Sequence, residues 1–335
     1  MSRRLLLAAR PVGEVKSSDF ELVEAEVPQA GDGEFVVEVT HLSIDPAMRG
    51  WMNDTRSYVE PVAIGSVMRA LALGRVSESR HQDFAVGDLV SGTFGVQEHA
   101  VSDGAGVRKV VPVEGVSPAA HLGALGMTGL TAYFGLLEVG RLSEGDTVLV
   151  SGAAGAVGTV AGQIAKLKGA GRVVGIAGGP EKCALLTGEL GFDAAIDYRA
   201  GDVLGAIRRE TPDGVDIYFD NVGGEVLDAA LTRLARGARV VICGAISQYN
   251  SAEGPRGPSN YMMLLVARAS MTGFLVFDFA ERYREALAEL GAWVAAGRVR
   301  SIEDVVTGGV EDFPEVLRRL FRGQNTGKLV LELKR

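Results

Sequence analysis

The chain has 335 residues, of which 47% are hydrophobic and 23% charged, and its formal net charge at pH 7 is −8. This length is sufficient for two domains with separate hydrophobic cores, and the composition is that of an ordinary globular protein. The negative charge, together with the lack of any basic run in the sequence, argues against a nucleic-acid-binding surface.

The first third of the chain predicts a compact, barrel-like β domain. Its apolar runs are short and are separated by Gly, Pro, Asp and Ser, which is typical of antiparallel strands. These runs lie at residues 4–9, 35–42, 71–76, 88–94 and 107–112. The stretch Asp45–Gly50 predicts a loop that turns into a short helix. From Gly123 the composition becomes rich in Gly, Ala and Leu, so we place the first domain at residues 1–122.

The stretch Thr147–Lys166 predicts a strand, a tight turn and a helix. The apolar β-branched run at its start suits a buried parallel strand, and the periodic apolar segment that follows suits a helix packed on that strand. Ala153, Gly155 and Gly158 occupy the three small-residue positions of the dinucleotide-binding fingerprint. The predicted phosphate-binding turn comprises Ala153, Gly155, Ala156, Val157 and Gly158. The segment carries no charge until Lys166, but its glycines argue against a membrane span, and we expect none.

The strand–helix alternation continues beyond this unit. Further strands are predicted at residues 172–177, 194–198, 215–221 and 238–244, and the alternation ends in a helix near 280–297. Such a series predicts a parallel, doubly wound Rossmann sheet, in a domain that we place at residues 123–297. The helix predicted at 313–322 and the strand at 328–333 do not extend the series. We therefore expect residues 298–335 to return to the first domain, which makes the α/β fold discontinuous in sequence.

The end of the second predicted strand indicates which nicotinamide cofactor is bound. NAD-binding proteins place an Asp or Glu there to bind the ribose 2′-hydroxyl. Here the strand ends in Ile176–Gly179, which contains Gly178 and no acid. No carboxylate at this position would therefore repel a 2′-phosphate. Lys182 follows within reach of that phosphate as a point charge, and Arg199 is a further candidate. We expect NADPH rather than NADH.

The sequence predicts no metal site. Cys183 and Cys243 are the only cysteines, which excludes a disulfide framework and favours a reducing, cytoplasmic compartment. Neither cysteine has the spacing of a zinc-ligand set, and the four histidines also lack ligand spacing. A mechanism in which zinc polarises an alcohol is therefore not expected.

Six short motifs follow one another along the chain: Asp45-Pro46-x-Met48-Arg49-Gly50, Gly126-Met127-x-Gly129-Leu130-Thr131-Ala132-Tyr133, Ala153–Gly158, Asp220–Gly224, Cys243–Asn250 and Asn325-x-Gly327-Lys328. With these motifs in this order, the chain resembles the zinc-free, NADPH-dependent double-bond reductases of the medium-chain dehydrogenase/reductase family. Relatives in this group are the leukotriene B4 dehydrogenases/prostaglandin reductases, the plant alkenal reductases and the bacterial curcumin reductases. The resemblance implies a GroES-like substrate domain, a Rossmann domain and a homodimer.

The resemblance also implies further cofactor-binding residues. Tyr198 is expected to bind the 2′-phosphate together with Lys182. The remaining residues that the motifs place at the cofactor are Met127, Thr128, Asn221, Cys243, Gly244, Ile246, Tyr249 and Asn325. Asp45, Arg49 and Asn53 are expected to have a structural role. The chain departs from many relatives at Ala47, where they carry an aromatic residue, and at Thr128, where they carry proline, so no single relative's substrate can be transferred.

Without a metal, a conjugated alkene is the easier hydride acceptor. Hydride transfer to the β-carbon of an α,β-unsaturated ketone or aldehyde places charge on the carbonyl oxygen, which needs a hydrogen-bond donor. Tyrosine is a suitable neutral donor. Tyr249, after the fifth predicted strand, and Tyr58, on a loop that resembles the substrate loop of curcumin reductases, are the candidate catalytic residues. The alternative role of Tyr249 is to pack against the cofactor. The alternative for Tyr58 is an aromatic residue at the rim of the site.

Two other functions remain open from the sequence. The first is an NADPH-dependent quinone reductase on the same fold. The second, from a different class, is a non-catalytic NADPH-binding protein that regulates a partner. A small conjugated carbonyl compound is the expected ligand besides the cofactor.

Overall fold

The computed structural model describes residues 1–334, which form two compact units. The first unit is Met1–Leu122 together with the segment that begins at Glu303, and the second is Gly123–Ile302. Each unit has its own sheets and its own buried apolar residues. The predicted α/β fold class, with a parallel sheet and a second domain discontinuous in sequence, is confirmed.

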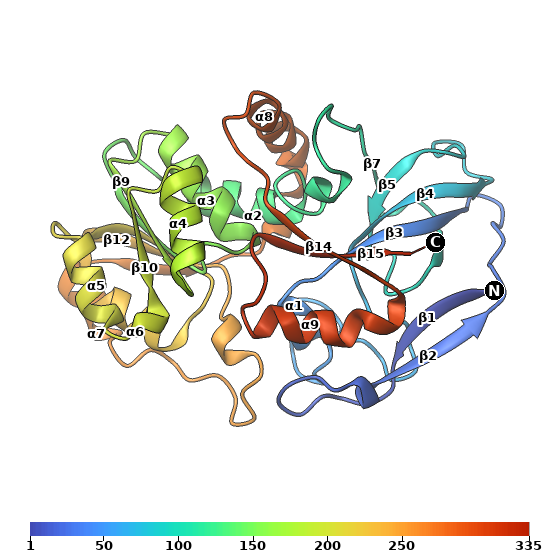
Figure 1. Ribbon diagram of the computed structural model, residues 1–335, viewed down its shortest axis with the longest axis horizontal. Coiled ribbons are helices and arrows are strands. Elements are labelled where there is room, and N and C mark those ends of the chain that lie inside the picture. The colour runs from blue at the N-terminus through green and yellow to red at the C-terminus, as the bar shows by residue number, and fades with distance from the viewer. Residues whose placement is uncertain (335) are drawn as a thin grey trace. The chain divides into compact units, whose positions relative to one another are not determined.

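The second unit is built on a parallel sheet (Figure 1). Its strands are β8 (Thr147–Ser151), β9 (Arg172–Ala177), β10 (Ala194–Asp197), β11 (Val215–Asp220), β12 (Leu234–Ile242) and β13 (Ser270–Gly273). Over the described residues they lie in the order β10-β9-β8-β11-β12-β13. Val148, Leu149 and Val150 of the central strand β8 are completely buried, as expected of a strand that is covered on both faces.

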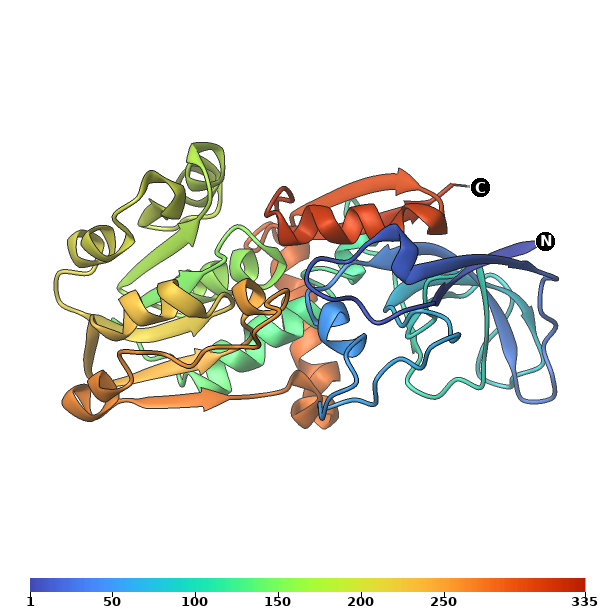
Figure 2. The same ribbon diagram turned by 90° about the horizontal axis from the view of Figure 1, so that it is seen from below.

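The helices of the second unit, seen in Figure 2, are α2 (Met127–Phe134), α3 (Ala156–Leu167), α4 (Pro180–Glu189), α5 (Val203–Glu210), α6 (Gly224–Leu231), α7 (Met262–Ala267) and α8 (Tyr283–Ala295). The helices from α3 to α7 connect the strands of the sheet, whereas α2 precedes β8 and α8 follows β13. The helices α3 and α4 lead away from β8 on one side, whereas α6 and α7 lead away from β11 on the other. Because such crossovers are right-handed, the two pairs cover opposite faces. The carboxyl ends of β8 and β11 therefore flank the switch point where these sheets bind ligands.

Three features of this unit differ from the sequence predictions. Strand β12 runs from Leu234 to Ile242, whereas the prediction was 238–244. It ends at Ile242 because the N–H groups of Cys243 and Gly244 donate to the carbonyl oxygen of Asp220, at 2.9 and 3.1 Å. The edge strand β13 was not predicted, since all four of its residues are exposed and it has no buried apolar run. The predicted helix at 280–297 is α8, and a separate 3₁₀ segment, Val276–Arg282, precedes it.

The first unit contains a mixed sheet that joins distant parts of the chain. Its strands are β3 (Phe35–Ser43), β4 (Ala72–Ser79), β5 (Leu89–Gly92), β6 (His99–Ser102), β7 (Arg108–Lys109), β14 (Glu303–Gly308) and β15 (Lys328–Leu333). Strand β15 pairs antiparallel with β3 and parallel with β14, so that the red strand β15 of Figure 1 lies between β14 and the blue strand β3. The run predicted at 107–112 contributes only the two residues of β7, and β6 was not predicted.

A buried lysine ties β15 to the loop that follows β3. Lys328 is 1% exposed, and its Nζ donates to the carbonyl oxygens of Ile44 (2.7 Å) and Leu329 (3.0 Å) and to Asp45 Oδ1 (3.1 Å). Burial lowers the pKa of Lys328, and the Asp45 carboxylate opposes this shift. The loop that leads into helix α1 (Ala47–Trp51) is thereby fixed from the C-terminal part of the chain.

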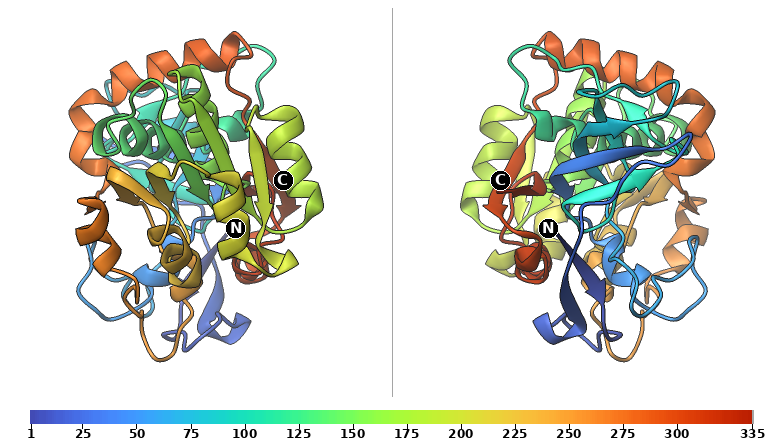
Figure 3. Two further views of the ribbon diagram at one scale, coloured as in Figure 1. Left: turned by 90° about the vertical axis from the view of Figure 1, so that its left-hand side faces the viewer. Right: turned by 90° about the vertical axis from the view of Figure 1, so that its right-hand side faces the viewer.

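The chain begins in a separate two-stranded ribbon formed by β1 (Ser2–Leu7) and β2 (Phe20–Ala25), seen beside the N-terminus in Figure 3. Strand β1 begins and ends two residues earlier than the predicted run at 4–9, and β2 was not predicted. The segment between the two strands is held by Arg49 of α1, which is buried. Its Nε donates to the carbonyl oxygen of Gly13 at 3.0 Å, and its Nη2 to that of Pro11 at 2.9 Å. This contact agrees with the structural role expected for Arg49.

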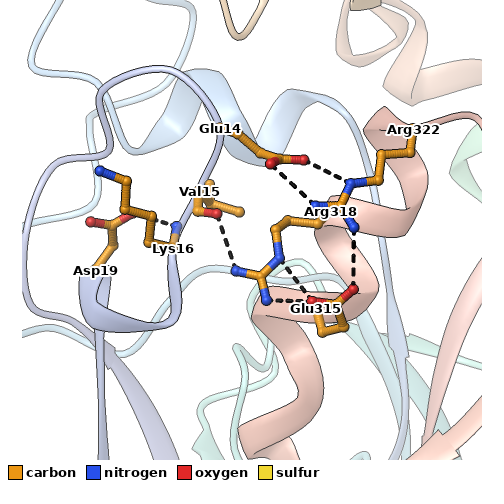
Figure 4. Close-up of polar contacts among 7 residues, drawn as sticks. All are labelled: Glu14, Val15, Lys16, Asp19, Glu315, Arg318 and Arg322. Atoms are coloured by element: carbon orange, nitrogen blue, oxygen red, sulfur yellow. Dashed lines mark hydrogen bonds and ion pairs between the residues drawn. The ribbon is translucent and has the colours of Figure 1, made fainter.

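The same segment is also bound to helix α9 (Phe313–Phe321) by ion pairs (Figure 4). Arg322 contacts Glu14 with its Nε at 3.1 Å, and Arg318 donates to the carbonyl oxygen of Val15 at 3.3 Å. Glu315 pairs with both arginines. Glu14, Glu315 and Arg322 are exposed, so each of these ion pairs stabilises the fold by less than about 1 kcal/mol. Among residues 1–334 the longest helices are too short or too polar to cross a membrane.

Candidate active site

The turn between β8 and α3 has room only for small residues. Gly152 has a φ of +57°, a conformation that side chains rarely adopt. A Cβ added at Gly158 would lie 2.3 Å from the carbonyl oxygen of Gly152 and 2.7 Å from the Cα of Ala153. The turn leads into the N-terminus of the 12-residue helix α3, where backbone N–H groups and the helix dipole favour phosphate. These residues fit the pyrophosphate of a dinucleotide.

The carboxyl end of β11 carries a buried carboxylate that the sequence reasoning did not single out. Asp220 is 1% exposed, and its Oδ1 accepts hydrogen bonds from Ser151 Oγ and the Tyr218 hydroxyl, both at 2.8 Å. It also accepts from the N–H groups of Val222 and Gly223, both at 3.0 Å. The available signal was the Asp220–Gly224 motif at a strand end, where a carboxylate can bond to the N–H groups that follow it.

Asn221, a predicted cofactor residue, lies between β8 and β11. Its N–H donates to Ser151 Oγ at 2.9 Å, and its Nδ2 donates to the Ser151 carbonyl oxygen at 2.7 Å. The Asn221 side chain thus links the carboxyl end of β11 to that of β8. The structure brings it beside the dinucleotide turn, since an added Cβ at Gly152 would lie 3.4 Å from the Cβ of Asn221.

The segment after β12 places Tyr249 at the same edge of the sheet. The hydroxyl oxygen of Tyr249 accepts the N–H of Ala245 at 3.1 Å, and an added Cβ at Gly244 would lie 3.1 Å from that oxygen. The N–H of Ile246 donates to the Asn221 carbonyl oxygen at 3.2 Å. Gly244 therefore allows a close approach of the Tyr249 hydroxyl, and its contact with the cofactor stays a prediction.

Three of the residues predicted at the 2′-phosphate, Gly178, Tyr198 and Arg199, lie close together. The ring of Tyr198 packs on Gly178, where an added Cβ would come within 2.8 Å of ring atoms. The guanidinium of Arg199 lies 5.8 Å from the centre of the Tyr198 ring. Lys182 is half-buried in the first turn of α4. A cation next to an aromatic face is a suitable setting for a phosphate-bearing nucleoside.

Asp197, at the end of β10, is a second carboxylate that the sequence reasoning missed. Its Oδ1 accepts the N–H groups of Gly179 at 2.8 Å and Arg199 at 2.9 Å, and these two bonds hold its pKa below the usual value. The carboxylate thus anchors both loops of the predicted 2′-phosphate site. An Asp at a strand end that is followed by a turn is the signal that could have identified it.

Met127 and Thr128 lie in the first turn of α2. Thr128 Oγ1 donates to the carbonyl oxygen of Gly123 at 2.9 Å, which fixes the start of the helix. The hydroxyl of Tyr283 lies 3.8 Å from Met127 Sδ, and burial followed by the charge of Asp278 raises the pKa of Tyr283 to about 12. Tyr283 therefore stays neutral, and its contact holds the Met127 side chain in place.

Two predicted residues belong to the first unit. Tyr58 is 47% exposed, and its hydroxyl accepts the indole N–H of Trp51 at 3.2 Å. Asn325 is 7% exposed, and its Nδ2 donates to the carbonyl oxygen of Gly327 at 2.9 Å. Each side chain is thus oriented by a neighbour on its own unit. Their functional roles stay predictions.

The two thiols are poor nucleophiles in this fold. Burial, and then the Asp220 carboxylate, raises the pKa of Cys243 to about 12. Burial and Asp197 also raise the pKa of Cys183. Across residues 1–334, His, Cys, Asp and Glu side chains form no group of three or more that could hold a metal ion.

Comparison with known proteins agrees with this geometry. A family model described as the N-terminal domain of oxidoreductase matches residues 3–110, and one described as zinc-binding dehydrogenase matches residues 156–292. The chain is 41% identical to the NADPH-dependent curcumin reductase of Escherichia coli (strain K12), over 99% of this chain and 97% of that protein. It is 40% identical to the NADP(+)-dependent 2-alkenal reductase of Nicotiana tabacum, over 100% of this chain and 98% of the relative.

The structural comparison gives the same result. The fold matches the crystal structure of CurA from Vibrio vulnificus in complex with NADPH with a TM-score of 0.93 and 42% sequence identity, and the match covers 99% of both chains. Identity at this level over the whole chain goes beyond a shared fold. The chain therefore belongs to the medium-chain dehydrogenase/reductase family.

Proposed function

We propose that the protein reduces the C=C bond of α,β-unsaturated ketones and aldehydes with NADPH. The observation that carries this proposal is the position of Tyr249, whose hydroxyl lies at the same strand edge as the dinucleotide turn. The printed activities of the curcumin and 2-alkenal reductases support it. The protein is accordingly an NADP-dependent oxidoreductase that acts on CH–CH groups.

In this scheme the residues of the protein bind and orient the cofactor and the substrate. NADPH, when bound, supplies the hydride that the β-carbon of the alkene accepts. The backbone of Gly155–Gly158 would hold the pyrophosphate of NADPH, and Lys182 and Tyr198 would hold its 2′-phosphate. Asn221 and Gly244 would form the edge of the loops beside the nicotinamide half of NADPH. Met127, with its sulfur held by Tyr283, presents an apolar surface from α2.

Tyr249 has the chemistry needed at the carbonyl oxygen of the substrate. As that oxygen becomes enolate-like, a neutral hydroxyl donor stabilises the developing charge. The Ala245 N–H donates to the oxygen of Tyr249, and a hydrogen bond received at a hydroxyl oxygen strengthens the bond that the hydroxyl donates. The backbone of the 243–249 segment therefore makes Tyr249 a better donor.

We also infer that the protein is a homodimer joined through β13 and α7. Strand β13 is an edge strand that pairs with β12 alone among the described residues, and an exposed edge is normally covered. Exposed apolar side chains lie in the strand itself and at α7, which precedes it along the chain: Tyr261 (58%), Met262 (52%), Leu265 (69%), Val266 (58%) and Met271 (39%). An apolar patch next to an edge strand suits a second copy, since one patch can pair with itself about a two-fold axis.

The dimer is tested by sedimentation. Leu265→Asp places a charge in the patch and should convert the dimer to monomer. Val111→Asp is the matched control, because Val111 is 79% exposed on the first unit. A monomeric parent protein, or a Leu265→Asp variant that sediments as a dimer, would refute the assignment.

The reductase function is tested by NADPH oxidation with a conjugated aryl enone, with parallel assays that use NADH and a quinone. The product is identified by mass spectrometry and NMR. A saturated ketone formed with a strong preference for NADPH supports the proposal. An allylic alcohol would show carbonyl reduction instead, turnover of the quinone alone would favour the quinone reductase, and NADPH binding without turnover would favour a non-catalytic protein.

A further inference from the structure

The buried carboxylate of Asp220 has an unusual set of partners. Four neutral donors converge on one of its oxygens, two from side chains at 2.8 Å and two from backbone N–H groups at 3.0 Å. A buried carboxylate is costly unless its hydrogen bonds are satisfied, and bonds to a charged acceptor are about twice as strong as neutral ones. These bonds therefore hold the Asp220 carboxylate in one position at the carboxyl edge of the sheet.

The first group of bonds joins the two strand ends at the switch point. Ser151 Oγ donates to Asp220 and accepts the N–H of Asn221 at 2.9 Å. Ser151 is completely buried and immediately precedes Gly152 of the dinucleotide turn. The carboxylate thus sets the position of the residue from which the turn departs.

A second group of bonds extends from Asp220 to the segment that carries Tyr249. The carbonyl oxygen of Asp220 accepts the N–H groups of Cys243 and Gly244, at 2.9 and 3.1 Å. The carbonyl oxygen of Val222 accepts Ser247 Oγ at 2.6 Å. Since the carboxylate holds the N–H of Val222, the 243–249 segment rests on a loop that Asp220 itself shapes.

We propose that Asp220 is a positioning residue for the reaction, whose carboxylate holds the dinucleotide turn, the 221–223 loop and Tyr249 in one arrangement. This inference rests on the proposed function, because it takes Tyr249 and the turn as the working parts. The negative charge is required, since it lets one oxygen satisfy four donors that would otherwise be buried without an adequate acceptor.

The test compares Asp220→Asn with Asp216→Asn. Asp216 links the same two strands at their amino ends, where its Oδ2 accepts the N–H of Thr147 at 2.9 Å. Asp220→Asn should raise the Kd for NADPH by about ten-fold or more and also lower kcat. Asp216→Asn should leave both within about two-fold of the parent protein, because its bond lies at the edge remote from the turn.

A double-mutant cycle separates positioning from a merely structural role. If Asp220 acts through Tyr249, then Tyr249→Phe should lower kcat by a smaller factor in the Asp220→Asn background than in the parent protein. Equal factors in both backgrounds would overturn the proposal, as would equal losses in Asp216→Asn and Asp220→Asn. If Tyr249→Phe alone leaves kcat unchanged, the role of Tyr249 in the proposed function fails, while the Kd for NADPH still tests Asp220.

A second variant keeps the inference testable if Asp220→Asn does not fold. Ser151→Ala removes one donor to the carboxylate and one acceptor of Asn221 N–H, and leaves the charge in place. It should raise the Kd for NADPH in the same direction by a smaller factor. A folded Ser151→Ala protein with unchanged Kd and kcat would overturn the proposal.

Discussion

A buried histidine should make the first unit sensitive to mild acid. His121 is 6% exposed at the end of the 3₁₀ segment Pro118–His121, and among residues 1–334 its buried Nδ1 has no hydrogen-bond partner. Burial, and then the positive charge of Arg108, lowers its pKa from 6.5 to about 4. The folded state therefore binds a proton at this site less readily than the unfolded chain does.

The sign and size of the effect follow from this difference. Because the pKa is lower in the folded state, the unfolding free energy should be unaffected by His121 above pH 6.5 and should fall as the pH decreases toward about 4. At about 1.36 kcal/mol per pH unit, the full loss is about 3 kcal/mol. His121→Leu removes both the titration and an unsatisfied polar atom, so its stability at pH 7 should lie within about 1 kcal/mol of the parent.

The two tryptophans allow this loss to be assigned to one unit. Trp51 lies in the first unit and Trp293 in the second, so in a Trp293→Phe background the fluorescence reports the first unit. Urea unfolding is followed between pH 7.5 and pH 4 (about one half-unit per step), with and without His121→Leu. The parent should lose about 3 kcal/mol more than the variant over this range. Parallel profiles would refute the assignment.

Three further results are expected. Lys182→Ala should raise the Kd for NADPH roughly ten- to one-hundred-fold and leave that for NADH nearly unchanged, because only NADPH has the 2′-phosphate; equal losses would place the phosphate elsewhere. Gly158→Ala should abolish measurable NADPH binding, since its Cβ would lie 2.3 Å from the Gly152 carbonyl oxygen, and calorimetric binding close to that of the parent would contradict this. Lys328→Met should lower the unfolding free energy by about 3–5 kcal/mol in urea titrations, because Asp45 and two carbonyl oxygens lose a buried donor; a loss under about 1 kcal/mol would show that the site relaxes.

The cofactor site could be predicted because its requirements are local. The turn at Gly152–Gly158 needs small residues within a few positions of each other, and steric limits of that kind are visible in the order of residues. The lack of an acid at the end of β9, in Ile176–Gly179, is likewise a local feature. The strand β13 could not be predicted, because its four exposed residues have no apolar pattern and it is a strand only through its pairing with β12.

The sequence by itself determined the βα series, the dinucleotide turn and the candidate residues Lys182 and Tyr249, since each depends on short-range pattern and chemistry. Only the tertiary structure decided which distant groups meet. Asp220 and Ser151 are 69 positions apart, yet they share a hydrogen bond because β8 and β11 are neighbours at the switch point of the sheet. Lys328 reaches Asp45 across 283 positions because β15 pairs with β3. Such contacts follow from strand order, which the sequence specifies only through the fold as a whole.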